Sequence, residues 1–463
     1  MDSTATFATY ADRIMQTYRC PGLALGVARN GEPAAWHAFG FRDREAQLPI
    51  TPDTVMGIGS CTKSFTCMAI MRLQEERRLS VYEPVIRHLP EFGLPDDDLS
   101  PLVTIHHLMT HTAGLPPLPA KLGALAPSAK GDPSLPPVDL SLLPTIDTPE
   151  QLLGFIRRYP FQPLARPGWQ FSYSDEGYGL LGAIIERVSG RRYEQYVTEE
   201  LLQPAGMEHT TFSQAEMRSF PEVATLYAAL PWSGEVIRSD QWWEGGPVTA
   251  AGFLRSTVRD LLRYVDIFRT GGLAGNRRIL SAESVREMMQ PHVYVDDGFW
   301  YGYGLAVRPD YHGLTVVEHG GSLKGVSAHF IYMAEDGLTG AALGNMQYVP
   351  AGLTLLGAMN EAAGLPTESR WTRWAPAQAD LPLAAYAGAY AADDGVRIEI
   401  AVDGDALTLT ASGLSSLNAR LTPAGGHRFG ARVREEDVVV NFLADEERGV
   451  WGLLQGLRVL RKA

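Results

Sequence analysis

Apolar positions at the start of the chain follow two different periods. Over residues 6–18 they recur every three or four residues, which predicts an amphipathic helix. They then alternate in two runs on either side of Asn30-Gly31, a pair that strongly favours a tight hairpin turn. We therefore expect a helix followed by a hairpin whose strands are 22–29 and 33–41.

Helical and strand-like patterns are interleaved through the middle of the chain. Such interleaving indicates an α/β (α+β) domain in which helices flank an antiparallel sheet. We expect helices at 60–77, 150–158, 176–189, 193–202 and 257–269, and strands near 303–308, 314–318, 326–333 and 338–344.

Residues 116–149 interrupt this pattern. They hold nine prolines and show no clear period, so they predict a long irregular insertion. Loops of this length usually either cover a functional site or are disordered. We expect this one to form a wall or lid over the active site.

The composition changes again near the C-terminus, where residues 366–382 predict a linker. Beyond it the pattern is entirely of short alternating strands separated by turns, which predicts a small antiparallel barrel. We expect a main domain over 1–365 and the barrel over 383–463. Its strands are expected at 396–402, 406–410, 427–434, 437–443, 448–454 and 457–461.

Bulk composition narrows the classes of function. The 463 residues carry a formal net charge of −13, which disfavours binding to nucleic acid. No uncharged apolar stretch is long enough to predict a membrane span. Residues 1–5 carry neither a basic stretch nor an apolar run, so no signal peptide is predicted and we expect a cytoplasmic protein. A leader that had already been removed would leave the same sequence. Three cysteines do not indicate a disulfide framework.

Lysine is scarce, with five lysines against 35 arginines, so a lysine at a meaningful spacing is informative. Ser60-Cys61-Thr62-Lys63 precedes a predicted helix, and residues three apart share one helix face. The Lys63 amine could therefore activate the Ser60 hydroxyl, which is a weak nucleophile without a base. The alternative is a helix-capping serine beside a solvated lysine.

Tyr173-Ser174-Asp175 supplies a second candidate element. A tyrosine near a lysine cation can lose its proton more easily and then relay protons. The same spacing recurs elsewhere in the chain, so a half-buried aromatic beside a helix cap is the alternative interpretation. The glycine-rich helix start that follows Asp175 favours the functional interpretation, in which Tyr173 relays protons.

The third element is His319-Gly320-Gly321-Ser322, after the apolar run that begins at Leu314. Glycines allow a substrate to approach the backbone, and a backbone N–H here, with that of Ser60, could form an oxyanion hole. A plain glycine turn beside a structural histidine is the alternative.

Other features of the sequence carry less weight. Tyr301 could contact a substrate or simply line the core. Three histidines lie close together, but without the glutamate of a zinc-binding helix we expect no metal site and no cofactor. They are His106, His107 and His111.

The ordered occurrence of these three motifs resembles the serine β-lactamase and penicillin-binding-protein superfamily. The similarity is greatest to its class C β-lactamase, D-aminopeptidase and esterase branch, and it covers roughly residues 6–362. Connecting stretches such as 104–115 and 167–190 resemble it too. The C-terminal barrel loosely resembles the lipocalin-like barrels of some peptidase relatives.

The resemblance implies roles for individual residues. Ser60 becomes the nucleophile, Lys63 and Tyr173 the proton shuttle, and His319 replaces the cation of the third motif. The backbone N–H of Ser322 becomes the second oxyanion donor. Apart from the resemblance, we expect substrate contacts at Asp175 from its charge, at Gly320 and Gly321 from the close approach that glycine allows, and at Tyr301 as an aromatic side chain.

Asp175 departs from the resembled pattern, because asparagine is usual at its position. An ionised Asp175 would hold Lys63 as an ammonium, shift the work of the base to Tyr173 and repel a substrate carboxylate. It would attract a free amine instead, whereas a protonated Asp175 would mimic asparagine, and the sequence leaves both states open. His319 is expected to be mostly neutral near pH 7, so we expect weak β-lactamase activity and a preference for neutral or amine-bearing substrates.

The predicted activity is hydrolysis of an ester or amide through an acyl-enzyme. The candidates are a D-amino-acid peptidase or amidase and a carboxylesterase. A transacylase, a weak β-lactamase and a catalytically silent protein that binds peptides or cell-wall fragments remain alternatives. The expected partner is a small ester, amide or short peptide, with neither nucleic acid nor membrane, and a homo-oligomer is left open.

Overall fold

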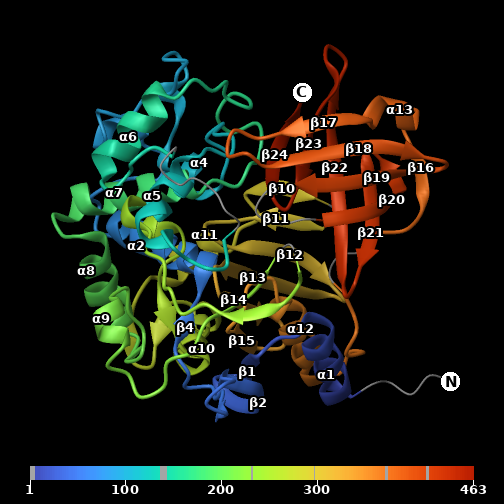
Figure 1. Ribbon diagram of the computed structural model, residues 1–463. Coiled ribbons are helices and arrows are strands. Elements are labelled where there is room, and N and C mark those ends of the chain that lie inside the picture. Colours follow the sequence, from blue (N-terminus) through green and yellow to red (C-terminus); the bar gives the residue numbers. More distant parts are fainter. Residues whose placement is uncertain (1–5, 136–142, 231–232, 297, 371–373, 413–416) are drawn as a thin grey trace.

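The computed structural model describes residues 6–135, 143–230, 233–296, 298–370, 374–412 and 417–463. Residues 136–142 of the expected insertion and 371–373 of the expected linker therefore lie outside the described residues. Two large sheets organise the chain, one built from strands between residues 22 and 344 and the other from strands after residue 376 (Figure 1).

The first sheet has nine strands in the order β10-β11-β12-β13-β14-β15-β1-β2-β3, each antiparallel to its neighbours. The expected hairpin pairs β1 with β2, and its turn residues Asn30 and Gly31 both have positive φ. The strands are β1 (Gly22–Arg29), β2 (Glu32–Asp43), β3 (Leu48–Pro49), β10 (Val293–Asp296), β11 (Phe299–Tyr301), β12 (Ala306–Tyr311), β13 (Leu314–Leu323), β14 (Val326–Met333) and β15 (Leu338–Gly344). Short pairs join β4 (Met56–Gly57) to β7 (Arg255–Ser256), β5 (Tyr227–Ala229) to β6 (Val236–Arg238) and β8 (Leu273–Ala274) to β9 (Arg277–Arg278).

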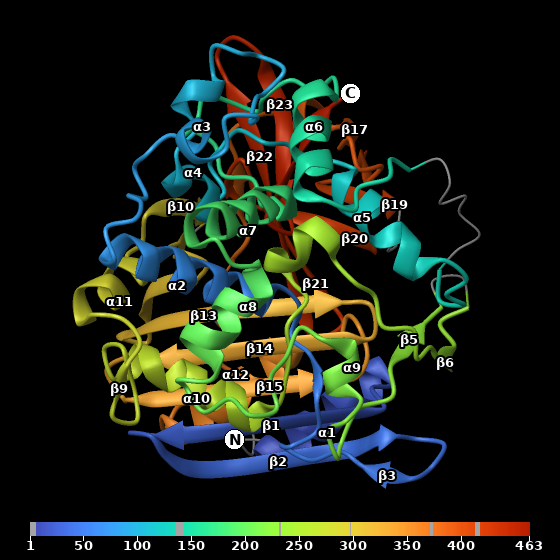
Figure 2. The same ribbon diagram turned by 90° about the vertical axis from the view of Figure 1, so that its left-hand side faces the viewer.

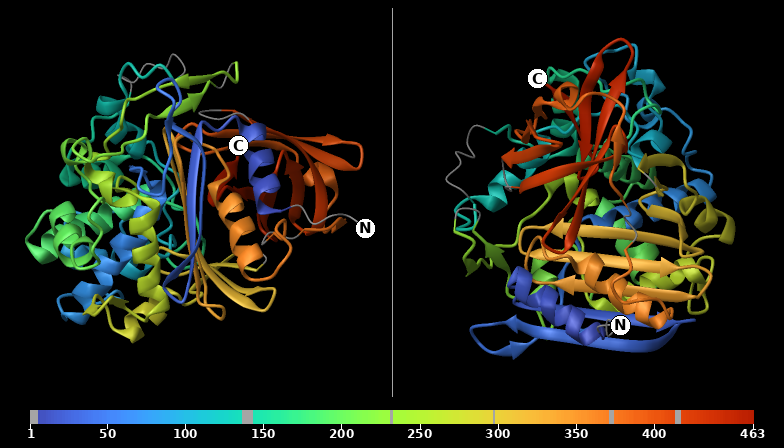
Figure 3. Two further views of the ribbon diagram at one scale, coloured as in Figure 1. Left: turned by 90° about the horizontal axis from the view of Figure 1, so that it is seen from below. Right: turned by 90° about the vertical axis from the view of Figure 1, so that its right-hand side faces the viewer.

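Helices cover both faces of this sheet, which explains why β1 is buried on both sides. One face carries most of the helices, including α2, α7 and α10, and the other carries α1 and α12 (Figures 2 and 3). The helices are α1 (Phe7–Tyr18), α2 (Thr62–Glu75), α3 (Val85–His88), α4 (Ile105–Met109), α5 (Ala120–Ala129), α6 (Pro149–Arg158), α7 (Asp175–Ser189), α8 (Tyr193–Val197), α9 (Gln214–Met217), α10 (Val258–Arg269), α11 (Ala282–Met288), α12 (Ala351–Ala362) and α13 (Leu383–Tyr386). No helix of the described ranges is long and apolar enough to span a bilayer.

The second sheet closes into a barrel of eight strands, because β20 pairs with both β19 and β21. Aromatic side chains of Tyr386, Tyr390, Phe429 and Phe442 fill its interior. The strands are β17 (Gly388–Ala391), β18 (Arg397–Asp403), β19 (Ala406–Ser412), β20 (Leu417–Gly426), β21 (Arg428–Val433), β22 (Glu436–Asp445), β23 (Gly449–Gln455) and β24 (Arg458–Lys462). The expected fold class, a helix-flanked antiparallel sheet plus a C-terminal barrel, is confirmed.

Several expected boundaries are wrong in ways that bear on the site. The insertion is not wholly irregular, because it contains α5, for which Pro119 is the N-cap residue. Pro127 lies inside this helix, two residues before its end, and cannot donate the hydrogen bond that other residues there would make. Strand β13 does not end near residue 318 but continues through the whole His319–Ser322 motif.

Further differences concern short strands. Of the strand expected near 303–308, only residues 306–308 are in a strand, as the start of β12; residues 302–305 form the turn between β11 and β12, with a positive φ at Gly304. Part of the expected linker forms β16 (Ala377–Ala379), which joins the barrel in parallel to β20. Strands β17 and β20 were not anticipated, because glycine and alanine dilute their alternation.

Candidate active site

Ser60 lies in a tight turn, Gly59–Cys61, that leads directly into α2. Every residue from Thr62 to Met71 is buried, so this helix start lies deep in the molecule. Gly59 has a φ of 50°, and a Cβ built on it would lie 2.6 Å from the amide nitrogen of Ser322. A glycine is therefore required where the nucleophile turn meets β13.

The Lys63 amine contacts Ser60 from the first turn of the same helix. Its Nζ lies 3.3 Å from Ser60 Oγ, and it donates to Asp175 Oδ1 at 2.6 Å and to the carbonyl oxygen of Ala251 at 2.7 Å. The side chain is fully buried. Burial lowers the pKa of Lys63, although the Asp175 carboxylate opposes this, so a neutral amine is more accessible than in water.

Asp175 is held by two lysines rather than one. Lys121, from α5, contacts Oδ2 at 2.6 Å, while Lys63 contacts Oδ1. Burial alone would raise the pKa of Asp175, but Lys121 and Lys63 together hold it well below its usual range. Lys121 was missed by the sequence interpretation; the scarcity of lysine was the available signal.

Tyr173 lies over the Lys63 amine, with 4.6 Å between Nζ and the ring centroid. Burial, and then the neighbouring Asp175, raise the pKa of Tyr173 well above its usual value, although the Ser60 side chain opposes this. The expectation that this tyrosine loses its proton easily is therefore wrong. Its hydroxyl can pass a proton on, but it is a poor resting base.

The His319–Ser322 segment runs past the nucleophile turn inside β13. A Cβ built on Gly321 would collide with the carbonyl oxygen of Ile58 and lie 3.1 Å from the amide nitrogen of Ser60. The two backbones thus approach as closely as glycine allows. This arrangement can place two N–H groups around one developing oxyanion.

His319 is neutral in this environment. Burial, and then the Lys63 cation, lower the pKa of His319 to about 4. Its Nδ1 lies 2.6 Å from the carbonyl oxygen of Gly320, which can only accept, so Nδ1 carries the proton. Nε2 then accepts from the buried Tyr301 hydroxyl at 2.9 Å. Tyr301 therefore orients His319, and His319 supplies no cation.

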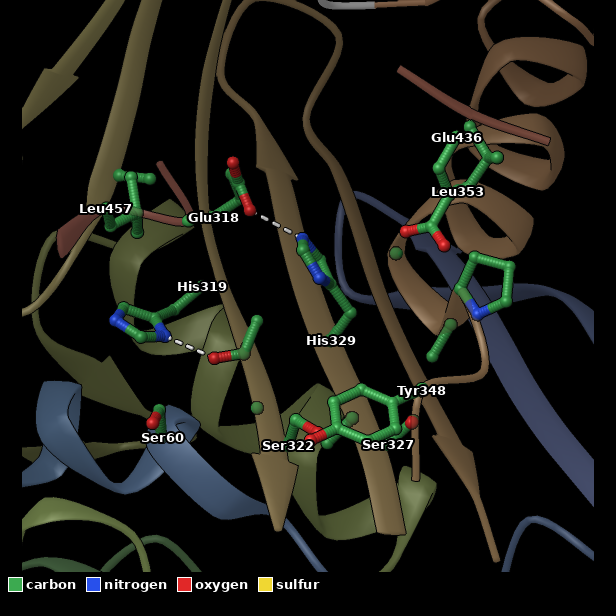
Figure 4. Close-up of a pocket in the computed structure, with 18 of the residues that line it drawn as sticks. Ser60, Glu318, His319, Ser322, Ser327, His329, Tyr348, Leu353, Glu436 and Leu457 are labelled. Carbon is green, nitrogen blue, oxygen red and sulfur yellow. Dashed lines mark hydrogen bonds and ion pairs between the residues drawn. The ribbon is translucent and has the colours of Figure 1, made fainter. Parts of the chain in front are cut away.

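A cavity of about 580 Å³ opens beside Ser60 between the first sheet and the barrel (Figure 4). Its charged residues are largely paired with one another: Glu318 contacts His329 at 2.5 Å and Arg308 at 3.3 Å. Leu457, in the β23–β24 turn of the barrel, also lines it, and its carbonyl oxygen accepts from the Tyr173 amide at 2.9 Å. The barrel therefore forms one wall of the site.

The histidines near residue 106 have structural partners. His106 bonds the Tyr303 hydroxyl at 2.9 Å, and His107 Nδ1 accepts from the amide of Thr104 at 3.2 Å. His111 Nδ1 accepts from the Ser174 amide at 3.0 Å, and its ring packs on Tyr173. Across the described ranges, no group of three or more potential ligands could hold a metal ion.

The chain is similar to known families and proteins. A family described as Beta-lactamase matches residues 7–364, and a domain of unknown function (DUF3471) matches residues 372–453. Protein flp of Staphylococcus aureus (strain MW2) is 28% identical over 268 residues, which cover 57% of this chain and 48% of that protein. Esterase EstB of Burkholderia gladioli is 35% identical over 213 residues, covering 45% of this chain and 51% of that protein.

The chain spans about half the length of the curated relatives it matches. Among solved structures, the octameric penicillin-binding protein homologue from Pyrococcus abyssi resembles it along nearly its whole length. The TM-score is 0.71 at 29% identity, and the match covers 98% of this chain and 99% of the other.

Proposed function

The chain belongs to the beta-lactamase family of serine hydrolases, and from that premise we propose that it cleaves an ester or amide bond through an acyl-enzyme on Ser60. The observation that carries the proposal is the contact of 3.3 Å between the buried Lys63 amine and the Ser60 hydroxyl, at the edge of a cavity. Burial of Lys63 favours the neutral amine that a general base must be.

The reaction follows from these positions. Lys63 takes the proton of Ser60 as Oγ bonds to the substrate carbonyl carbon, and the carbonyl oxygen becomes an oxyanion near the amides of Ser60 and Ser322. The bond to the leaving group then breaks, and the proton passes from Lys63, by way of the Tyr173 hydroxyl, to the departing oxygen or nitrogen. Water repeats the sequence on the acyl-enzyme and releases the acid.

The site favours an uncharged acyl group. Both oxygens of Asp175 are already paired with lysines, so it offers no free charge to a substrate amine. The expectation that Asp175 attracts a substrate amine therefore has no electrostatic basis in this site. His319 is neutral, which leaves that position without the cation that would bind the carboxylate of a β-lactam. We propose small uncharged carboxylic esters as the favoured substrates. D-aminoacyl amides, whose amine finds no free counter-charge at Asp175, should be poorer substrates, and β-lactamase activity should be weak.

The barrel acts in this proposal as a wall of the substrate cavity, since Leu457 lies beside Tyr173. We also propose a homo-oligomer, because the homologue from Pyrococcus abyssi is described as octameric and is similar over almost the whole chain. Light scattering on the purified protein tests the oligomer; a monomer at micromolar concentration would contradict it.

A fluorophosphonate probe tests the acyl-enzyme. Intact mass should show one adduct on the wild type, peptide mapping should place it on Ser60, and Ser60→Ala should lose both the adduct and the hydrolysis of p-nitrophenyl esters. Ser64, buried one turn further along α2, provides a matched control as Ser64→Ala. An adduct at another serine, or full turnover by Ser60→Ala, would refute the proposal.

A further inference from the structure

Lys121 contacts the Asp175 oxygen that Lys63 does not use. We propose that Lys121 is a positioning residue: it neutralises Asp175, so that Lys63 can give up its proton and act as the base. This inference rests on the proposed acyl-enzyme mechanism and names a residue outside its three motifs.

The geometry is that of one carboxylate between two ammonium groups. Each lysine lies 2.6 Å from a different oxygen of Asp175. Their surroundings differ, since the side chain of Lys63 is 0% exposed and that of Lys121 is 35% exposed. Water can therefore solvate the charge of Lys121 but not that of Lys63, so Lys121 is the better permanent counter-ion.

Lys121 is fixed in place by its backbone as well as by its side chain. Its amide donates to Glu176 Oε1 at 3.2 Å, which ties the start of α5 to the start of α7. Further along the same segment, Asp132 forms a buried ion pair of 3.0 Å with Lys324. The insertion thus holds Lys121 against the site from two anchored points.

The charge balance explains why a second lysine is needed. A lone carboxylate beside a buried lysine stabilises the ammonium form and makes Lys63 a poor base. A second cation on the same carboxylate weakens that hold, because it shares the negative charge and repels the proton on Lys63. Asp175 with Lys121 then presents Lys63 with a nearly neutral neighbour, as an asparagine would.

Other charged or titratable groups also face Lys63 and are common to every variant proposed below. They come from α7, from the segment before it, from β13, from the segment after α4 and from α2 itself, and they are Glu176, Tyr178, Tyr173, His319, His111 and Cys67.

The test compares Lys121→Met, Asp175→Asn and the double variant with the wild type. Lys130→Met is the matched control, because Lys130 is exposed at the other end of the same helix. Two readouts are used: the pH profile of kcat/KM for a p-nitrophenyl ester, and the pKa of Lys63 by NMR with ¹³C-labelled lysine. With five lysines in the chain, a Lys63→Gln spectrum assigns the signal.

Lys121→Met should raise the pKa of Lys63, and with it the acid limb of kcat/KM, by about one pH unit or more. Below that limb, activity should fall about tenfold or more. Adding Asp175→Asn to Lys121→Met should reverse the shift, because the uncompensated carboxylate is gone. Lys130→Met should match the wild type.

The proposal is overturned if Lys121→Met leaves the pKa of Lys63 and the acid limb unchanged, or if the double variant shows the same raised pKa as Lys121→Met. Melting temperatures show whether each variant is folded, and the NMR titration needs no activity. Failure of the wild type to form a Ser60 adduct would instead refute the acyl-enzyme, while the NMR comparison would still decide the role of Lys121.

Discussion

Replacing Gly321 by alanine tests the close approach between β13 and the nucleophile turn. The new Cβ would collide with the carbonyl oxygen of Ile58 and lie 3.1 Å from the Ser60 amide nitrogen. Its nearest atoms are backbone, so no side chain can move aside. Relief requires β13 and the turn to separate by about 1.5 Å to reach ordinary contact distance.

A separation of this size should disable the oxyanion hole. One donor is worth about 2.7–4 kcal/mol of transition-state stabilisation, so kcat should fall by about 10²–10³-fold. KM should change less, because the cavity walls stay in place. The overpacking itself should destabilise the fold by about 1–3 kcal/mol.

Gly320→Ala is the matched control at the neighbouring position. Its Cβ would meet only the ring of His329, at 3.0 Å, and a side chain at the edge of a cavity can tilt. Both variants would be assayed for kcat with a p-nitrophenyl ester, for the rate of fluorophosphonate labelling and for melting temperature. If Gly321→Ala keeps kcat within about threefold of Gly320→Ala, Gly321 does not set the oxyanion geometry.

Three further changes probe other parts of the site. Burial and Asp175 raise the pKa of Glu176 to about 7, so its stabilising contribution is complete below about pH 4.5 and lost as the pH rises through 7. Over that range the free energy of unfolding of the wild type, measured in urea, should fall by about 3 kcal/mol relative to that of Glu176→Gln. The same pH dependence of unfolding in both proteins would contradict this. Asp132→Asn should destabilise the protein by about 3–5 kcal/mol because it leaves Lys324 buried without its carboxylate; an unchanged melting temperature would show that the pair contributes nothing. Leu457→Gly places glycine at a φ of 69°, which glycine adopts freely, so the melting temperature should not fall. The change removes an apolar wall of the cavity, so KM should rise more for esters with bulky apolar acyl groups than for acetates. Equal KM changes would mean that Leu457 does not contact the acyl group.

The sequence alone was sufficient for the family and for the order of the main elements. Strands β14 and β15 match their predicted bounds, because each is a run of apolar residues ended by turn residues, and periodicity detects such runs. The Ser60–Lys63 pair could be recognised because spacing on one helix face is a local property. The roles of these residues, and the domain limits 1–365 and 383–463, stay predictions.

What only the tertiary structure decided were contacts between distant segments. Lys121 lies 54 residues from Asp175 in the sequence, and Leu457 lies still further from Tyr173, so no local pattern could pair them. The protonation states of the site residues were also decided by contacts between distant segments. Spacing predicted that Tyr173 ionises easily, but burial raises its pKa. The sequence left the protonation of Asp175 open, and two lysines hold it ionised and paired. A mostly neutral His319 was expected, and burial lowers its pKa further. Desolvation depends on everything packed around a group, and only the folded chain specifies that.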